Sequence, residues 1–332
     1  MRQVDVSPSP QSSRLTSQPS STLATFQASA TGKAIIVGEH AVVYGARAVA
    51  MPVRSLQMSV NLTATGKTER SGKASVRMLL GGRTVTDHLR GVVDDAFAVM
   101  GVTPFSLDIE GHSTVMIGAG LGSSASLCVV ILKAIAAASG RTLTAPELAN
   151  FANQLERRFH GNPSGLDTAA VAMEQVISFR KGEAPQSLQV TALGSKSPWR
   201  FALIDSGVRS STLAMIKVAA PYFQGPGGQD QVAAFDRLAE QVTLGLARGN
   251  ELDVAAAMKE ACQRLGEAGI VSDVLREVIE TAQHVGCLAA KPTGAGGGGC
   301  VLALLASDQA DAQLAALKEK LGSGKVYAVE LQ

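Results

Sequence analysis

The sequence predicts an α+β protein built from two domains. With 332 residues, of which 46% are hydrophobic, the chain is long enough for two domains and a sizeable core. Strand-like and helical runs occur in both halves, and there is no internal repeat. In the second half their order predicts helices packed against a small antiparallel sheet. We expect a disordered extension over 1–22, an N-terminal domain over 23–190 and a C-terminal domain over 191–332.

Composition limits the location and the partners of the chain. Residues 1–22 are rich in Ser, Pro and Gln and lack the apolar segment of a secretory signal; a transit peptide is the alternative to disorder. No apolar run reaches the roughly 20 residues that span a bilayer. Lys plus Arg (30) nearly balance Asp plus Glu (28), which argues against nucleic acid or a membrane surface as partner. Four scattered cysteines fit a cytoplasmic location.

Apolar patterning predicts the strands of the N-terminal half. They are expected at Thr25–Ala30, Ala34–Gly38, Val49–Val60, Ala74–Leu80 and Pro104–Glu110, with a polar, glycine-containing turn at Gly66–Gly72. Helical periodicity and helix-starting signals predict the helices. They are expected at Asp87–Met100, at Leu127–Ala138, from the capping box Thr144–Glu147 to about Arg158, and at Asp167–Met173.

The polar stretch Lys181–Pro198 is expected to separate the two halves. After it, strands are predicted at Arg200–Asp205, Cys287–Ala290, Cys300–Leu305 and Val326–Leu331. Helices are predicted at Thr212–Ala220, Gln231–Ala247, Val254–Leu265, Ser272–Val285 and Ala310–Leu321.

The segment Gly118-Ala119-Gly120-Leu121-Gly122-Ser123-Ser124 is the most informative part of the chain. Its glycines let backbone N–H groups approach a ligand closely, and the apolar run after it indicates a helix whose N-terminus favours an anion. It predicts a phosphate site in which a serine caps the helix and one serine reaches a magnesium ion. The alternative is a flexible loop with an ordinary serine cap. Neither a Walker loop nor a dinucleotide fingerprint fits the pattern.

A lysine lies beside an otherwise apolar strand. Burying an ammonium alone is costly, so Lys33 could hold a carboxylate and an attacking hydroxyl together. Glu39, His40 and Tyr44 follow the strand and could hydrogen-bond a polar substrate. The alternative is a surface lysine and a locally satisfied turn histidine.

Two acids flank a tight turn. Glu156 lies near the end of one predicted helix and Asp167 at the start of the next, with Gly-Asn-Pro-Ser-Gly between them at 161–165. The turn could bring both carboxylates to one site, where one holds magnesium and the other approaches a hydroxyl nucleophile. The alternative is that Glu156 pairs with a neighbouring arginine and Asp167 caps its helix.

A second glycine-rich segment, 294–299, lies between two predicted strands. Four consecutive glycines indicate close backbone packing, which we expect to be against the first glycine loop. A hairpin turn is the alternative, although it needs only one or two glycines.

In order and separation these segments resemble the three motifs of the GHMP kinases, a family named for galactokinase, homoserine kinase, mevalonate kinase and phosphomevalonate kinase. The resemblance spans about Ala28 to Gly299. It implies a two-domain GHMP kinase fold with a ribosomal-protein-like N-terminal domain and a ferredoxin-like C-terminal domain. Within the family, the run from Ala41 to Gly45 after Gly-Glu-His and the turn from His160 to Asp167 are most similar to the mevalonate kinase branch.

The resemblance implies ATP-dependent phosphorylation of mevalonate to 5-phosphomevalonate, with ATP and Mg²⁺ as cofactors. The roles that it implies are Asp167 as the catalytic aspartate, Lys33 as its partner, Gly118, Ala119, Gly120, Leu121, Gly122, Ser123 and Ser124 as the ATP cradle, Ser124 and Glu156 as magnesium ligands, and His40, Glu39 and Thr212 as substrate contacts. The register at Thr212, with Arg209 nearby, is ambiguous.

Two alternatives stay open at this point. One is a GHMP kinase for another small alcohol, phosphomevalonate or a sugar. The other is a non-catalytic ligand sensor on the same fold, against which the intact Lys33, Ser124, Glu156 and Asp167 count. One departure from the family pattern is Met116-Ile117, where a proline usually precedes the glycine loop. A homodimer is compatible with the sequence, which does not itself fix the oligomeric state.

Overall fold

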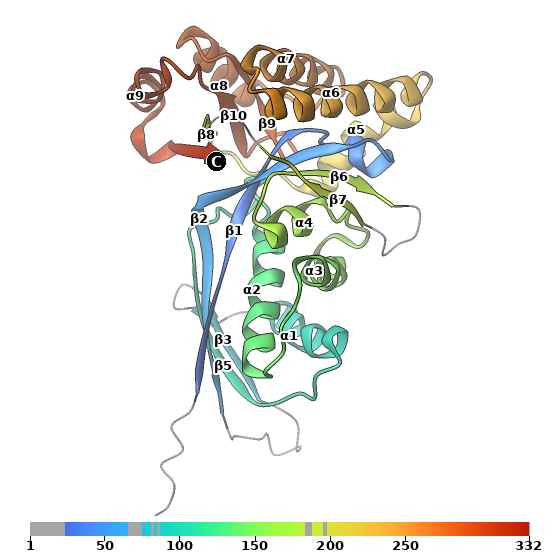
Figure 1. Ribbon diagram of the computed structural model, residues 1–332, viewed down its shortest axis with the longest axis vertical. Coiled ribbons are helices and arrows are strands. Elements are labelled where there is room, and N and C mark those ends of the chain that lie inside the picture. Colours follow the sequence, from blue (N-terminus) through green and yellow to red (C-terminus); the bar gives the residue numbers. More distant parts are fainter. Residues whose placement is uncertain are drawn as a thin grey trace, which may run out of the picture.

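The computed structural model describes residues 24–65, 75–80, 83–84, 87–182, 188–194 and 198–331. The predicted extension 1–22 and the predicted turn Gly66–Gly72 lie outside these residues. Two α+β halves lie end to end, and the long hairpin of β1 (Thr25–Val37) and β2 (Ala48–Ala64) runs through the lower half to the upper one (Figure 1). None of the helices in the described part of the chain is long and apolar enough to cross a membrane.

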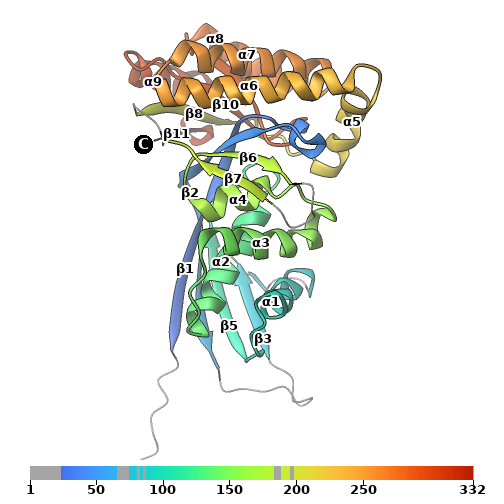
Figure 2. The ribbon, with the colours of Figure 1, turned by 45° about the vertical axis from the view of Figure 1, so that its right-hand side comes forward.

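The lower half is a sheet covered by helices. Its described strands follow the order β4-β3-β5-β2-β6-β7, with β1 paired to β2. The strands not yet bounded are β3 (Val76–Leu80), β4 (Arg83–Thr84), β5 (Leu107–Ser113), β6 (Ile177–Lys181) and β7 (Leu188–Ala192). The helices on this sheet are α1 (Asp87–Met100), α2 (Ser123–Ala138), α3 (Ala145–His160) and α4 (Leu166–Met173) (Figure 2).

Helix α2 is central because it is apolar on nearly all sides, and its residues from Ala125 to Ile135 are almost all buried. It carries the glycine loop at its N-terminus to the junction of the two halves. Helix α3 begins with the predicted capping box: the Thr144 side chain accepts from the Glu147 backbone, and the Glu147 carboxylate accepts from the Thr144 backbone.

The upper half is a second, antiparallel sheet in the order β11-β8-β10-β9 with helices against it. Its elements are β8 (Trp199–Asp205), α5 (Thr212–Gln224), α6 (Gly228–Arg248), α7 (Glu251–Glu267), α8 (Asp273–His284), β9 (Ala289–Thr293), β10 (Cys300–Leu304), α9 (Ala310–Leu321) and β11 (Val326–Leu331). Along β8, Phe201 and Leu203 face the core of α6 and α7, whereas Ala202 and Ile204 face that of α8 and α9. This confirms the predicted arrangement.

Some strands differ from those predicted. The two runs predicted at Thr25–Ala30 and Ala34–Gly38 form one strand. The pairing register with β2 shifts between Thr31 and Gly32, and this irregularity lets the strand continue. The strand predicted at Pro104–Glu110 lies three residues later, as β5, where it pairs with β2 and β3. The polar stretch Lys181–Pro198 is not only a connection, since it contains β7, which pairs with β6.

The strand predicted at Cys287–Ala290 continues further along the chain as β9, to Thr293. A proline is tolerated in it because β9 is the edge strand of its sheet. Its charged member, Lys291, finds a buried carboxylate partner that local sequence does not reveal.

The two halves share a core. Ala34, Ile36 and Val49 of the hairpin pack with residues of β8, α6 and α7. Asp236 on α6 accepts hydrogen bonds from Arg47 and Arg180 of the lower half. The predicted boundary between 190 and 191 falls inside β7, so we propose that the second domain begins after this strand.

Candidate active site

The first glycine loop ends at the N-terminus of α2. Gly118, Gly120 and Gly122 have φ values of 69°, 79° and 72°, and Gly122 is the N-cap residue. The prediction that a serine caps the helix is wrong, because Ser123 and Ser124 lie inside α2 and no side chain caps it. The first N–H groups of α2 and the positive end of its dipole therefore face a position that suits an anion such as phosphate.

Lys33 and Asp167 meet beside this loop. The Lys33 backbone N–H donates to Leu121 O at 3.0 Å, and the Lys33 side chain lies against Gly122. Lys33 Nζ is 2.9 Å from Asp167 Oδ1, with the lysine side chain 2% exposed and the aspartate 34% exposed. The ammonium is thus buried, while its carboxylate partner stays open to a ligand.

Ser124 and Glu156 form a second pair at the start of α2. Ser124 Oγ donates to Glu156 Oε1 at 2.7 Å, and His160 Nε2 lies 3.2 Å from the same Oγ. Burial, with a further contribution from Asp167, raises the pKa of Glu156 to about 8, against the lowering effects of Ser124 and Lys33. The structure brings the two acids of the turn, Glu156 and Asp167, close enough to interact. A hard divalent cation beside them would offset both the burial of the Glu156 carboxylate and its repulsion by Asp167.

The second glycine-rich segment packs on the first loop, which confirms the predicted close approach. A Cβ atom on Gly120 would lie 2.5 Å from Thr293 O, and one on Gly294 would lie 2.6 Å from Gly120 Cα. Cys300 N donates to Ala119 O at 3.2 Å. The position of the phosphate loop therefore depends on a segment that lies far away in the sequence.

Glu39 and His40, two of the expected substrate contacts, instead bond β9 and the second glycine-rich segment, respectively. Glu39 Oε1 accepts a hydrogen bond from Lys291 Nζ, and both side chains are buried. Burial raises the pKa of Glu39, and Lys291 opposes that rise. His40 Nε2 lies 2.8 Å from Ala295 O, and burial lowers the pKa of His40. Because Glu39 is closed off from solvent, we propose that it does not contact the substrate.

Thr212 is exposed as the first residue of α5, whose N-cap is Ser211. Arg209 binds Asp205 through both Nη atoms, at 2.7 and 2.8 Å, and its side chain lies beside Gly118. In this segment it is therefore Arg209 that contacts the glycine loop.

Two residues, His160 and Lys291, make contacts near the site that the sequence did not predict. His160 follows Glu156 by four residues, a spacing that puts both on one face of a helix and could have revealed the contact. For Lys291 the only local signal was a lysine within an apolar strand run.

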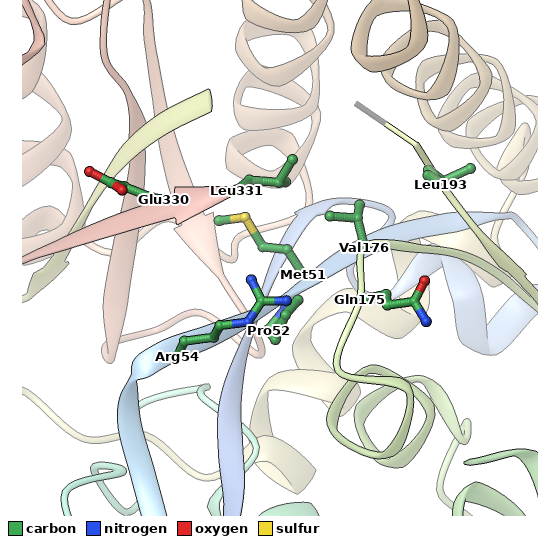
Figure 3. Close-up of a pocket in the computed structure, with 8 residues that line it drawn as sticks. All are labelled: Met51, Pro52, Arg54, Gln175, Val176, Leu193, Glu330 and Leu331. Atoms are coloured by element: carbon green, nitrogen blue, oxygen red, sulfur yellow. The ribbon is translucent and has the colours of Figure 1, made fainter. Parts of the chain in front are cut away.

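The pocket drawn in Figure 3 is separate from the candidate active site. It is lined by Met51, Pro52, Arg54, Gln175, Val176, Leu193, Glu330 and Leu331. Lys33, Ser124, Glu156 and Asp167 are not among these lining residues.

Comparison with known proteins gives two family matches. Residues 87–175 match the GHMP kinases N terminal domain, and residues 244–323 match the GHMP kinases C terminal domain. The two matches lie in the lower and upper halves, and together they cover about half of the chain. The chain belongs to the GHMP kinase family. Its fold is accordingly the two-domain α+β fold of these kinases.

Several relatives carry the name mevalonate kinase. The protein of Aeropyrum pernix is 28% identical over 307 residues, covering 88% of this chain and 92% of the relative. That of Schizosaccharomyces pombe is 27% identical over 370 residues, covering 91% and 89%.

Solved structures of this family superpose on nearly the whole chain. An L. major mevalonate kinase in complex with R-mevalonate has a TM-score of 0.79 and 22% identity, with 95% of this chain and 98% of that chain covered. A Streptococcus pneumoniae phosphomevalonate kinase in complex with phosphomevalonate and AMPPNP has a TM-score of 0.76 and 17% identity, covering 92% and 99%. Because kinases for different substrates fit almost equally well, the backbone alone does not select the substrate.

Proposed function

We propose that this GHMP kinase transfers a phosphoryl group from ATP to mevalonate, giving 5-phosphomevalonate. The observation that carries the mechanism is the Lys33–Asp167 pair, 2.9 Å apart beside the glycine loop. The choice of substrate is supported by relatives named mevalonate kinase that align over most of the chain.

In this mechanism the residues act mainly by positioning and by charge, as phosphoryl transfer requires. The loop 118–124 holds the ATP phosphates with its N–H groups and the dipole of α2. Asp167 orients the substrate hydroxyl and accepts its proton as the new O–P bond forms. Lys33 holds Asp167 in place and brings a positive charge close to the transferred group.

We further propose that Mg²⁺ accompanies ATP and that Ser124 Oγ and Glu156 hold it. Both are hard oxygen donors, and magnesium commonly uses one or two protein carboxylates together with substrate phosphates. The part of the chain that the structure describes has no group of three or more His, Cys, Asp or Glu side chains arranged for a metal. When bound, the ion would neutralise phosphate charge.

Glu156→Gln is expected to raise the Mg²⁺ concentration for half-maximal rate at least about tenfold. Replacing a residue that only hydrogen-bonds a metal ligand typically lowers metal affinity by at least about tenfold, and Glu156 is itself a proposed ligand. Initial rates across a magnesium titration at fixed ATP would measure it. Glu319→Gln, an exposed carboxylate on α9, is the control. A change confined to the KM for mevalonate would instead make Glu156 a substrate residue.

Three cations, Lys33, Arg47 and Lys291, already have carboxylate partners, which favours a substrate without a phosphate. Recognition of phosphomevalonate would need additional cationic groups to pair with its phosphate. Lys33 binds Asp167, Arg47 binds Asp236, and the buried Lys291 binds Glu39.

We therefore expect kcat/KM for mevalonate to exceed that for phosphomevalonate or galactose at least about tenfold, or about 1.4 kcal/mol. Release of ADP with ATP, magnesium and each alcohol at equal concentration would measure it. A preference for phosphomevalonate would keep the fold and overturn the substrate. ADP release with none of the three would favour the ligand sensor.

We also propose a cytoplasmic location. It is supported by the cysteines of the described residues, Cys128, Cys262, Cys287 and Cys300, which are all free thiols.

A further inference from the structure

Two opposite charges are buried together where the halves meet. Lys291 on β9 and Glu39, just after β1, have side chains that are 0% and 1% exposed. Lys291 Nζ donates both to Glu39 Oε1 and to Pro292 O. Removing two charges from water is expensive, and well-packed apolar residues often stabilise a fold as well or better. Stability is therefore a poor explanation for this pair.

The hydrogen bonding of Glu39 also disfavours a stabilising role for the pair. Its second oxygen, Oε2, is buried and has no hydrogen-bond partner within the described part of the chain. An unsatisfied buried acceptor destabilises a fold. The pair therefore lowers the stability of the fold, and it joins two segments of the chain, β9 and the residues after β1.

On one side the pair fixes the strand that leads into the second glycine-rich segment. Two residues after Lys291, Thr293 Oγ1 accepts from Ile35 N at 2.7 Å and donates to Ile35 O at 3.2 Å. The next residue, Gly294, is in backbone contact with Gly120 of the phosphate loop. A shift of β9 would therefore move the loop.

On the other side the pair fixes the segment after β1. Glu39 is followed by His40, whose φ of 56° is unusual for a residue other than glycine. The His40 ring bonds Ala295 O, so the second glycine-rich segment is held at Ala295 as well as through β9.

We propose that the Lys291–Glu39 pair positions the phosphate-binding loop by fixing β9 and the segment 294–299 against residues 118–122. Lys291 is then a positioning residue for the phosphoryl transfer proposed above, on which this inference rests. It acts through the backbone contacts of the glycines and does not touch the substrates.

The test compares two carboxylate-to-amide variants of nearly equal shape. Glu39→Gln weakens the buried pair, whereas Asp236→Asn weakens the Arg47 and Arg180 contacts, which also join the two halves but touch neither glycine segment. For each, magnesium–AMPPNP affinity is measured by calorimetry, amide hydrogen exchange is measured at Gly297, Gly299 and Cys300, and kcat and KM are measured with mevalonate.

Glu39→Gln is expected to weaken AMPPNP binding and to lower kcat, each at least about tenfold, since a misplacement of about 1 Å can cost about 100-fold. Exchange at the three amides should accelerate, because they bond Ile270 O, Val208 O and Ala119 O. Asp236→Asn should leave all of these values near those of the wild type. If Glu39→Gln does not fold, the uncharged double variant Glu39→Gln/Lys291→Met replaces it, with the same expected losses.

Three results would overturn the proposal. The first is a folded variant with wild-type AMPPNP affinity and amide exchange, and the second is a rise in the KM for mevalonate alone, which would make Glu39 a substrate contact. The third is failure of both variants to fold, which would make the role of the pair purely structural. If the wild type does not phosphorylate mevalonate but Glu39→Gln still weakens AMPPNP binding, the substrate assignment fails and the positioning role stands.

Discussion

Asp167→Asn is expected to bind ATP nearly as the wild type does and to lose turnover at least about 100-fold, the lower range for a positioned acid–base group. The amide keeps the shape of the side chain but is a poor proton acceptor. It also leaves the Lys33 ammonium, 2% exposed, without its charged partner. Steady-state rates with mevalonate and a calorimetric titration with magnesium–AMPPNP would measure the two effects separately.

A surface carboxylate provides the control for this variant. Asp311, on α9, pairs with Arg200 at 2.5 Å and is 86% exposed, so Asp311→Asn should leave turnover unchanged. If Asp167→Asn turned over as fast as the wild type, Asp167 would not face the reacting hydroxyl.

Gly120→Ala is expected to reduce stability and nucleotide affinity together. Gly120 has a φ of +79°, and an added Cβ atom would lie 2.5 Å from Thr293 O. The left-handed conformation costs a residue other than glycine about 1–2 kcal/mol. Relief of the clash must also separate the two glycine segments, so we expect AMPPNP affinity to fall at least about tenfold, or about 1.4 kcal/mol.

Gly140→Ala separates the conformational cost from the clash. Gly140 follows α2 with a φ of +69°, and no atom lies within 4 Å of an added Cβ atom. Thermal unfolding should show a loss of stability in both variants, whereas only Gly120→Ala should lose AMPPNP affinity. Equal losses of affinity would mean that the contact between the glycine segments does not shape the nucleotide site.

The parts of the site that the sequence predicted depend on local spacing. Glu156 and Asp167 are joined by a short turn, and the phosphate loop directly precedes the apolar helix that it serves. The capping box at Thr144 is local in the same way. Features of this kind can be predicted from the sequence because the groups that interact are close together along the chain.

The parts that were missed depend on distant partners. Lys291 and Glu39 are 252 residues apart, and nothing near either one reveals the other. Ser124 lies inside α2, where its hydroxyl bonds Glu156 of another helix, a contact that the local sequence does not reveal. Strand β7 lies in a polar stretch and is defined only by its pairing with β6.

The position of the transferred phosphate tests the central claim most directly. Mevalonate, ATP and magnesium would be incubated with the protein, and the product would be examined by ³¹P nuclear magnetic resonance with coupling to protons. The proposed function predicts ADP and a phosphate ester whose phosphorus couples to the C5 methylene protons of mevalonate. Unchanged mevalonate, ATP hydrolysed to free phosphate, or an ester at another hydroxyl would contradict it.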